Sequence, residues 1–312
     1  MTFKKFTEAL TREVRNIIHE EMDDAISISL NKVVKTNDEV LHGITLKMPD
    51  KNCMPTFYFE DFYEAYEEGD DIKEMAKAIV GISCEAYLNV PDFATFSLEF
   101  ENVRDHLLVQ LLDADLNEER LKQMVYKPVG NGFVMVAYIA IKSSSEGYMR
   151  TAVTKDMAES YGYNEDEVMD TAFSNTIARF EPIFASLIGF NKKGVISPED
   201  NLLDKNLKIN ADRQLYILTN ASFNDGACTF FYPFVAERIG EILGDNYYVL
   251  PSSLHEVIIV PANMNLEVKT MQRMVSDANS TVVDKRDILS EKVLFYNREK
   301  NILRVQNAEY SQ

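Results

Sequence analysis

The sequence predicts an α+β fold of two mixed layers, with antiparallel hairpins and helices packed on one side. Two patterns predict this class. Apolar and polar residues alternate in neighbouring pairs of short segments, as in β-hairpins, and between those pairs apolar residues recur at three- and four-residue steps, as on one helix face. At 312 residues the chain exceeds the size of most single cores, so two domains are predicted, at 1–126 and 127–312.

The first domain is predicted to begin with a helix, a hairpin and a third strand. Apolar residues follow one helical face over 3–22, alternate over 26–30 and 40–48, and form a short run at 54–59. His42 lies on the apolar face of the hairpin, so we predict a buried core histidine.

An acidic helical region follows, in which carboxylates over 60–74 are interspersed with aromatic and aliphatic residues over 62–79. Its candidate binding residues are Glu60, Asp61, Tyr63 and Glu64. The pattern leaves open a solvated helix face, a protein docking surface and a metal site, although the D-x-D-x-D-G loop typical of calcium binding is missing.

The middle of the chain alternates strand and helix signals. Thr154 and Asn164, the latter with Glu167 three residues on, have the spacing of helix N-caps. Residues 190–213 are polar and aperiodic, and we predict a long surface excursion. The other predicted elements are a strand at 107–112, a helix at 116–124, a turn at 128–132 that suggests the domain boundary, and a hairpin of 133–141 with 148–153.

The last hundred residues are predicted to follow the order β-β-α-β-β-α-β-β. Pro233 fits the first turn of a helix and Gly244 its end. The predicted strands are 215–218, 227–232, 247–250, 255–260, 293–296 and 302–305, and the predicted helices are 233–243 and 266–278.

Charge and composition limit the function classes. With 32 Lys and Arg against 50 Asp and Glu, the net charge is −18, which repels nucleic-acid backbones and anionic membranes. It suits simple solubility, a basic protein partner, or a mimic of nucleic acid. No direct nucleic-acid binding and no membrane association are therefore expected.

Other sequence features indicate a cytoplasmic protein without a cofactor or metal. The N-terminus lacks the apolar core of a signal peptide, and no run is long enough to span a membrane. Cys53, Cys84 and Cys228 are widely spaced, which predicts reduced thiols and no zinc site. Gly130 and Gly132 alone do not make a dinucleotide-binding loop.

The segment from Tyr248 to Pro261 holds the densest group of reactive side chains. Ser253 and His255 are the candidate catalytic residues, and Ser252 and Glu256 are candidate binding residues. In an extended strand Ser253 and His255 would share one face, with Cα atoms roughly 6.5–7 Å apart, and Glu256 would point to the other face. No G-x-S-x-G motif exposes a serine on a strained turn. The sequence leaves open a structural role, a ligand contact and catalysis.

The chain also resembles a known family. The matching residues are Leu215 to Asn220, Gly226-Ala227, Tyr232-Pro233 and, most specifically, Leu250-Pro251-Ser252-Ser253-Leu254-His255-Glu256. Together they resemble an uncharacterised bacterial domain-of-unknown-function family (number 5688), from Gram-positive gut anaerobes and often carried on mobile elements. The resemblance implies a bacterial cytoplasmic protein and brings no catalytic residues.

These observations lead to three functional hypotheses. The leading one is a non-enzymatic, acidic, cytoplasmic protein that binds another protein, as an accessory or counter-defence factor of a mobile element. The second is a hydrolase or small-ligand enzyme that uses Ser253 and His255. The third is a nucleic-acid mimic whose acids at 60–74 and 164–170 lie together on one surface.

Overall fold

The computed structural model describes residues 1–21, 25–49, 54–89, 98–144, 147–189, 200–203 and 214–306. The predicted α+β class is confirmed. The chain divides into two compact units: Met1–Lys35 with Glu39–Asn102, and Thr36–Asp38 with Val103–Gln312. The boundary predicted at 126/127 falls at the first residue of a strand within the second unit. The proline- and glycine-containing turn that suggested it connects two paired strands of one sheet.

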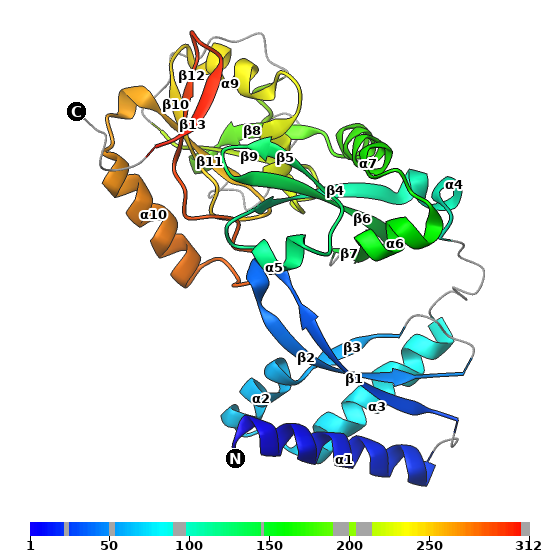
Figure 1. The fold of residues 1–312 in the computed structure, drawn as a ribbon. Helices are drawn as coiled ribbons and strands as arrows, with labels where there is room; N and C mark the ends of the chain where they lie inside the picture. Colours follow the sequence, from blue (N-terminus) through cyan, green and yellow to red (C-terminus); the bar gives the residue numbers. More distant parts are fainter. Residues whose placement is uncertain are drawn as a thin grey trace. The chain divides into compact units, whose positions relative to one another are not determined.

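The first unit is a three-stranded antiparallel sheet with helices on one side (Figure 1). The strands lie in the order β1-β2-β3, and the helix, hairpin and third strand predicted here are confirmed. The elements are α1 (Phe3–Glu21), β1 (Ser27–Val34), β2 (Val40–Lys47), β3 (Thr56–Tyr58), α2 (Phe59–Glu68) and α3 (Ile72–Asn89).

Its core forms where the apolar stripe of α1 meets the sheet. Phe6 and Leu10 of α1 pack with Ile44 of β2 and Ile79 of α3, all at 0% exposure. The three- and four-residue spacing in α1 and the two-residue spacing in β2 bring these side chains to one face, as the sequence predicted. His42 departs from this pattern. Its side chain is 51% exposed and bonds to a carboxylate, so the prediction of a buried histidine was wrong.

The second unit begins with a four-stranded antiparallel sheet built on one long strand. β6 (Phe133–Ser144) pairs with β4 (Leu107–Asp113), β5 (Tyr126–Gly130) and β7 (Gly147–Ala152). The short elements of this part are η1 (Thr36–Asp38), η3 (Arg104–His106) and α5 (Glu118–Leu121), and α4 (Phe100–Val103) spans the division between the two units.

Two capped helices follow this sheet, α6 (Lys155–Tyr161) and α7 (Glu165–Arg179). The Thr154 hydroxyl accepts from the Met157 amide at 3.1 Å, and the Asn164 side chain accepts from the Glu167 amide at 3.1 Å. Both predicted N-caps are confirmed.

A six-stranded antiparallel sheet completes the second unit, in the order β13-β12-β10-β11-β9-β8. Its strands are β8 (Pro182–Ser186), β9 (Tyr216–Asn220), β10 (Tyr247–Leu250), β11 (Val257–Pro261), β12 (Leu294–Asn297) and β13 (Ile302–Val305). The other elements are η5 (Gly226–Phe231), α9 (Val235–Leu243), η6 (Ala262–Met264) and α10 (Val268–Thr281).

Helices cover both faces of this sheet. Met271 of α10 packs against Leu250 and Val260, whereas the Tyr247 hydroxyl donates to the Ala236 carbonyl of α9 at 2.7 Å. Leu250 and Tyr247 stand on opposite faces because they are three residues apart in one strand.

Two predicted strands in this part of the chain differ from the structure, and a third prediction lies mostly outside the described residues. The strand predicted at 227–232 is wrong, since this buried apolar run forms η5, and periodicity alone cannot separate a short buried strand from a helical turn. The strand predicted from 255 begins instead at Val257. Of the predicted excursion at 190–213, residues 190–199 and 204–213 lie outside the described residues.

Gly226 tests the packing of the second unit. A Cβ there would lie 2.3 Å from the His255 carbonyl oxygen and 2.9 Å from the Asn220 amide nitrogen, both backbone atoms. We expect Gly226→Ala to lower the free energy of unfolding by about 1–3 kcal/mol, measured by urea denaturation.

Gly81 of α3 is the matched control, because nothing lies within 4 Å of a Cβ built there. Gly81→Ala should raise stability by about 0.5–1 kcal/mol, as expected for alanine in a helix interior. Equal effects of the two substitutions would contradict this packing.

Candidate functional site

The predicted segment Ser252 to Glu256 is a connection between strands. β10 ends at Leu250 and β11 begins at Val257. Ser253 forms an isolated antiparallel bridge with Ile288, and the Leu254 amide donates to the Asp287 carbonyl at 2.8 Å. The strand geometry predicted for this segment is therefore wrong, because its backbone pairs with residues 287–289 rather than extending either strand.

The structure places Ser253 against the backbone and Glu256, and not against the imidazole. The Ser253 hydroxyl accepts from the His255 amide at 3.0 Å and bonds to the Glu256 carboxylate. Ser252 and Ser253 are 8% and 3% exposed. Both hydroxyls are thus part of a buried corner.

Both nitrogens of the His255 ring are engaged. Nδ1 accepts from the Asp225 amide at 3.2 Å, and Nε2 lies 3.2 Å from Oδ2 of Asp287. A general base needs a ring nitrogen with a free lone pair facing the nucleophile's hydroxyl. In this arrangement neither nitrogen of His255 faces Ser253, so the geometry gives no support to a nucleophile–base pair.

The charges at this corner depend on one another. The hydrogen bond that His255 donates to Asp287 raises the pKa of His255, against the effect of burial, and the same bond lowers the pKa of Asp287. The nearby carboxylates of Asp225 and Glu256 also raise the pKa of His255. Burial raises the pKa of Glu256.

Asp225 is the centre of a buried polar network that the sequence analysis missed. Its side chain is 8% exposed and receives three donors: Gln110 Nε2 at 2.7 Å, the Tyr138 hydroxyl at 3.2 Å, and the Arg150 guanidinium in an ion pair. Its backbone amide holds His255. Gln110, Tyr138 and Arg150 come from β4, β6 and β7, whereas His255 belongs to the six-stranded sheet's connections.

This network joins the two sheets of the second unit. Buried carboxylates are costly unless they are paired and fully hydrogen-bonded, and Asp225 is both. Gln110 stands between apolar residues of a fully buried strand, and this polar residue was the one sequence signal that could have indicated a buried partner. The Asp225 network fixes the positions of the surrounding backbone and of the Arg150 charge, which is a structural role.

The four candidate residues of the acidic segment in the first unit have different surroundings. The Glu60 carboxylate is engaged within the unit, because it accepts from the His42 amide at 3.0 Å and bonds to the His42 ring at 2.8 Å. The Tyr63 hydroxyl donates to the Met1 carbonyl at 2.7 Å, and its ring packs on Phe3. Glu64 is exposed. Of the four candidates, only Asp61 lines a cavity found in the described part of the chain.

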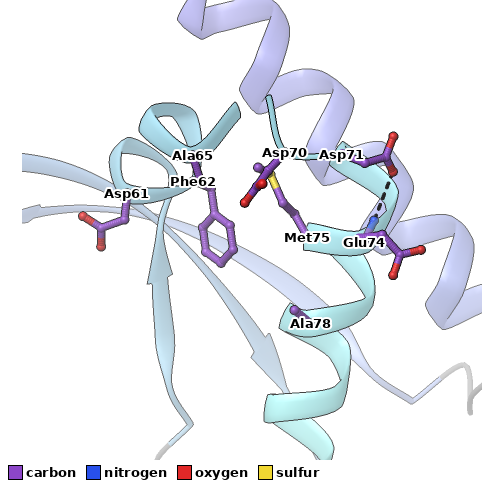
Figure 2. A pocket seen from close by; sticks show the side chains of 8 residues that line it. All are labelled: Asp61, Phe62, Ala65, Asp70, Asp71, Glu74, Met75 and Ala78. Atoms are coloured by element: carbon purple, nitrogen blue, oxygen red, sulfur yellow. Dashed lines mark hydrogen bonds between the residues drawn. The ribbon is translucent and has the colours of Figure 1, made fainter. Parts of the chain in front are cut away.

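That cavity lies between α2 and α3 and has a volume of about 520 Å³. Figure 2 shows Phe62 and Met75 pointing toward one another between the helices, with Asp70 beside them. Ala65 and Ala78 extend the apolar lining. The acidic residues at its rim are Asp61, Asp70, Asp71 and Glu74.

Two rim carboxylates also have local roles. Asp71 caps α3, since its Oδ1 accepts from the amides of Lys73 at 2.9 Å and Glu74 at 3.2 Å. Glu74 pairs with Lys77 at 2.7 Å in an exposed ion pair of small energetic value. Beyond the cavity lining, Ile82 of α3 is 49% exposed one helical turn after Ala78.

Metal ligands do not gather in the part of the chain that the structure describes, where no three His, Cys, Asp or Glu side chains could hold an ion. Cys84 and Cys228 are free thiols, and burial raises the pKa of Cys228 to about 12. Cys53 lies outside the described residues. Among the helices of the described residues, none is long and apolar enough to cross a membrane.

The fold and these sites define an acidic α+β protein whose signature segment is a buried structural corner. The chain belongs to the family of unknown function DUF5688, whose model matches residues 3–298. The resemblance stated from the sequence is confirmed. The match does not concern the host, so an origin in Gram-positive gut anaerobes stays a prediction. No curated protein and no solved structure gives a significant match.

The His255–Asp287 bond predicts how the ring titrates. His255 should have a pKa above the ordinary value of about 6.5, and Asp287→Asn should lower it, because the negative charge that stabilises the protonated ring is lost. The measurement is an NMR titration of the histidine ring protons, with the His255 signal assigned by its loss in His255→Gln.

The sign of the stability effect follows from both shifts. The pKa of His255 is raised by folding, so its contribution to stability is complete at pH values below the pKa of histidine in the unfolded chain. The pKa of Asp287 is lowered by folding, so its contribution is complete at pH values above the pKa of aspartate in the unfolded chain. Asp287→Asn should therefore cost most between these unfolded values, at about pH 4–6.5, and less at higher pH. A cost that increases above pH 7 would contradict the pairing.

Proposed function

We propose that this protein is a non-enzymatic, acidic binding protein of the bacterial cytoplasm. In this proposal its α2–α3 cavity receives a basic segment of a partner protein. The observation that carries the proposal is the cavity itself, where an apolar lining of Phe62, Ala65, Met75 and Ala78 is bordered by carboxylates. An amphipathic segment with Lys or Arg beside an apolar side chain is complementary to this surface.

The charge of the whole chain supports the same kind of partner. A net charge of −18 attracts basic proteins at long range and repels nucleic acid. By its resemblance to a family often carried on mobile elements, we further propose that the protein acts as an accessory factor of such an element.

Capture experiments with one substitution test the proposal. Ala78→Arg places a long cation in the cavity, so it should fill the apolar space and repel a basic segment. We expect the wild-type protein to retain a stoichiometric partner from a lysate of its host, and Ala78→Arg to retain much less. Ala221→Arg is the matched control, because Ala221 is exposed on a loop outside the cavity and the charge change is the same.

The partner should also dissociate as salt concentration increases, since the rim contacts are exposed charges. If no stoichiometric partner is recovered at low and moderate salt, the proposal fails. It also fails if Ala78→Arg retains the partner as well as Ala221→Arg does.

A further inference from the structure

A second cavity of the first unit has the opposite charge. It measures about 670 Å³ and is lined by α1, β1, the start of β2 and Phe59. We name it the α1–β1 groove. Its apolar lining includes Phe3, Phe59 and Leu30.

Leu30 shows why the groove is open. It is paired in register with Ile44, so both side chains stand on the face of the sheet that carries the core. Ile44 is fully buried, whereas Leu30 is 60% exposed. Ile28 of β1 still packs against the core on this face, so the helices leave the face accessible at Leu30 and Lys32. An exposed leucine on a core face indicates a contact surface.

Cationic side chains surround this apolar surface. Lys4, Arg12 and Arg15 project from α1 and Lys32 from β1, while Glu8 is the one carboxylate among the lining residues. Among the residues that the structure describes, none of these four cations makes an ion pair. In a chain with 50 acidic and 32 basic residues, an unpaired cationic group is not explained by fold stability.

The sheet edge beside the groove adds a third feature. Within the described part of the chain, β1 pairs with β2 along its whole length and with no strand on its other side. Its outer edge therefore presents backbone donors and acceptors, which can pair with an extended peptide.

We propose that the α1–β1 groove binds an extended acidic segment of a partner protein as an additional strand beside β1. Backbone bonds to the β1 edge align the segment, an apolar side chain covers Leu30, and carboxylates meet Arg12, Arg15 and Lys32. A folded polyanion such as nucleic acid fits less well, because its larger and denser charge is repelled more strongly by the rest of the chain and it offers no backbone to pair with the β1 edge. This site is distinct from the acidic α2–α3 cavity and does not depend on it.

A model peptide tests the proposal with the full chain. The probe is a fluorescent peptide of about twelve residues in which every second residue is Thr and the positions between alternate Val and Glu, so that one face carries both apolar and acidic side chains. We expect saturable binding by fluorescence anisotropy, and much weaker binding of the same peptide with Gln in place of Glu. Arg12→Glu with Arg15→Glu should weaken binding at least about tenfold.

Two control variants locate the effect. Lys269→Glu reverses an exposed cation of α10 outside the groove and should leave the affinity unchanged. Ala78→Arg should also leave it unchanged, so that failure of this inference and failure of the proposed function are separable. Circular dichroism of each variant checks that the fold is retained, which is expected because Arg12 and Arg15 are exposed.

Amide hydrogen exchange reports the mode of binding. The bound peptide should slow exchange in β1, because backbone bonds form at its edge. Absence of binding, or binding without protection of β1, would overturn the proposal. So would preferential binding of a single-stranded RNA oligonucleotide or of phosphatidylserine vesicles, or a dimer that forms through the groove.

Discussion

The second unit depends on one buried carboxylate. Asp225 accepts from the side chains of Gln110, Tyr138 and Arg150, and its amide holds the His255 ring. Loss of one donor would leave part of the buried carboxylate without a hydrogen bond and away from water. The free-energy cost of such an unpaired group is larger than the net contribution of the hydrogen bond itself. Burial close to Asp225 also raises the pKa of Tyr138 and of Cys228, so this interior favours neutral groups around a single compensated ion pair.

The same constraint explains why the most distinctive segment of the sequence is structural. A serine, a histidine and a glutamate within four residues suggest catalysis, but here each has a neighbour that fixes it. Ser253 holds the His255 amide, and Asp225 and Asp287 hold its ring. The two cavities that we propose as partner sites lie in the first unit, where each combines charge with apolar residues.

Local sequence patterns predicted most elements and both helix caps, because periodicity and capping act over a few residues. They failed where long-range packing decides. The run predicted as a strand at 227–232 lies largely in η5, which starts at Gly226, packed against the His255 carbonyl. The exposed His42 bonds to Glu60, eighteen positions away. The Asp225 network joins residues up to 115 positions apart, and no spacing rule connects them. Of the candidates in the predicted acidic segment, only Asp61 lines the α2–α3 cavity.

A double-mutant cycle between Asp225 and Arg150 tests this account most directly. Asp225→Asn suits the site because asparagine tolerates the positive φ of 50° found there, and Arg150→Met removes the guanidinium. The free energies of unfolding of both single variants and the double variant give the coupling energy. We predict a coupling of about 1–3 kcal/mol, with each single variant strongly destabilised. Additive effects, within about 0.5 kcal/mol, would contradict the claim that this ion pair holds the second unit together.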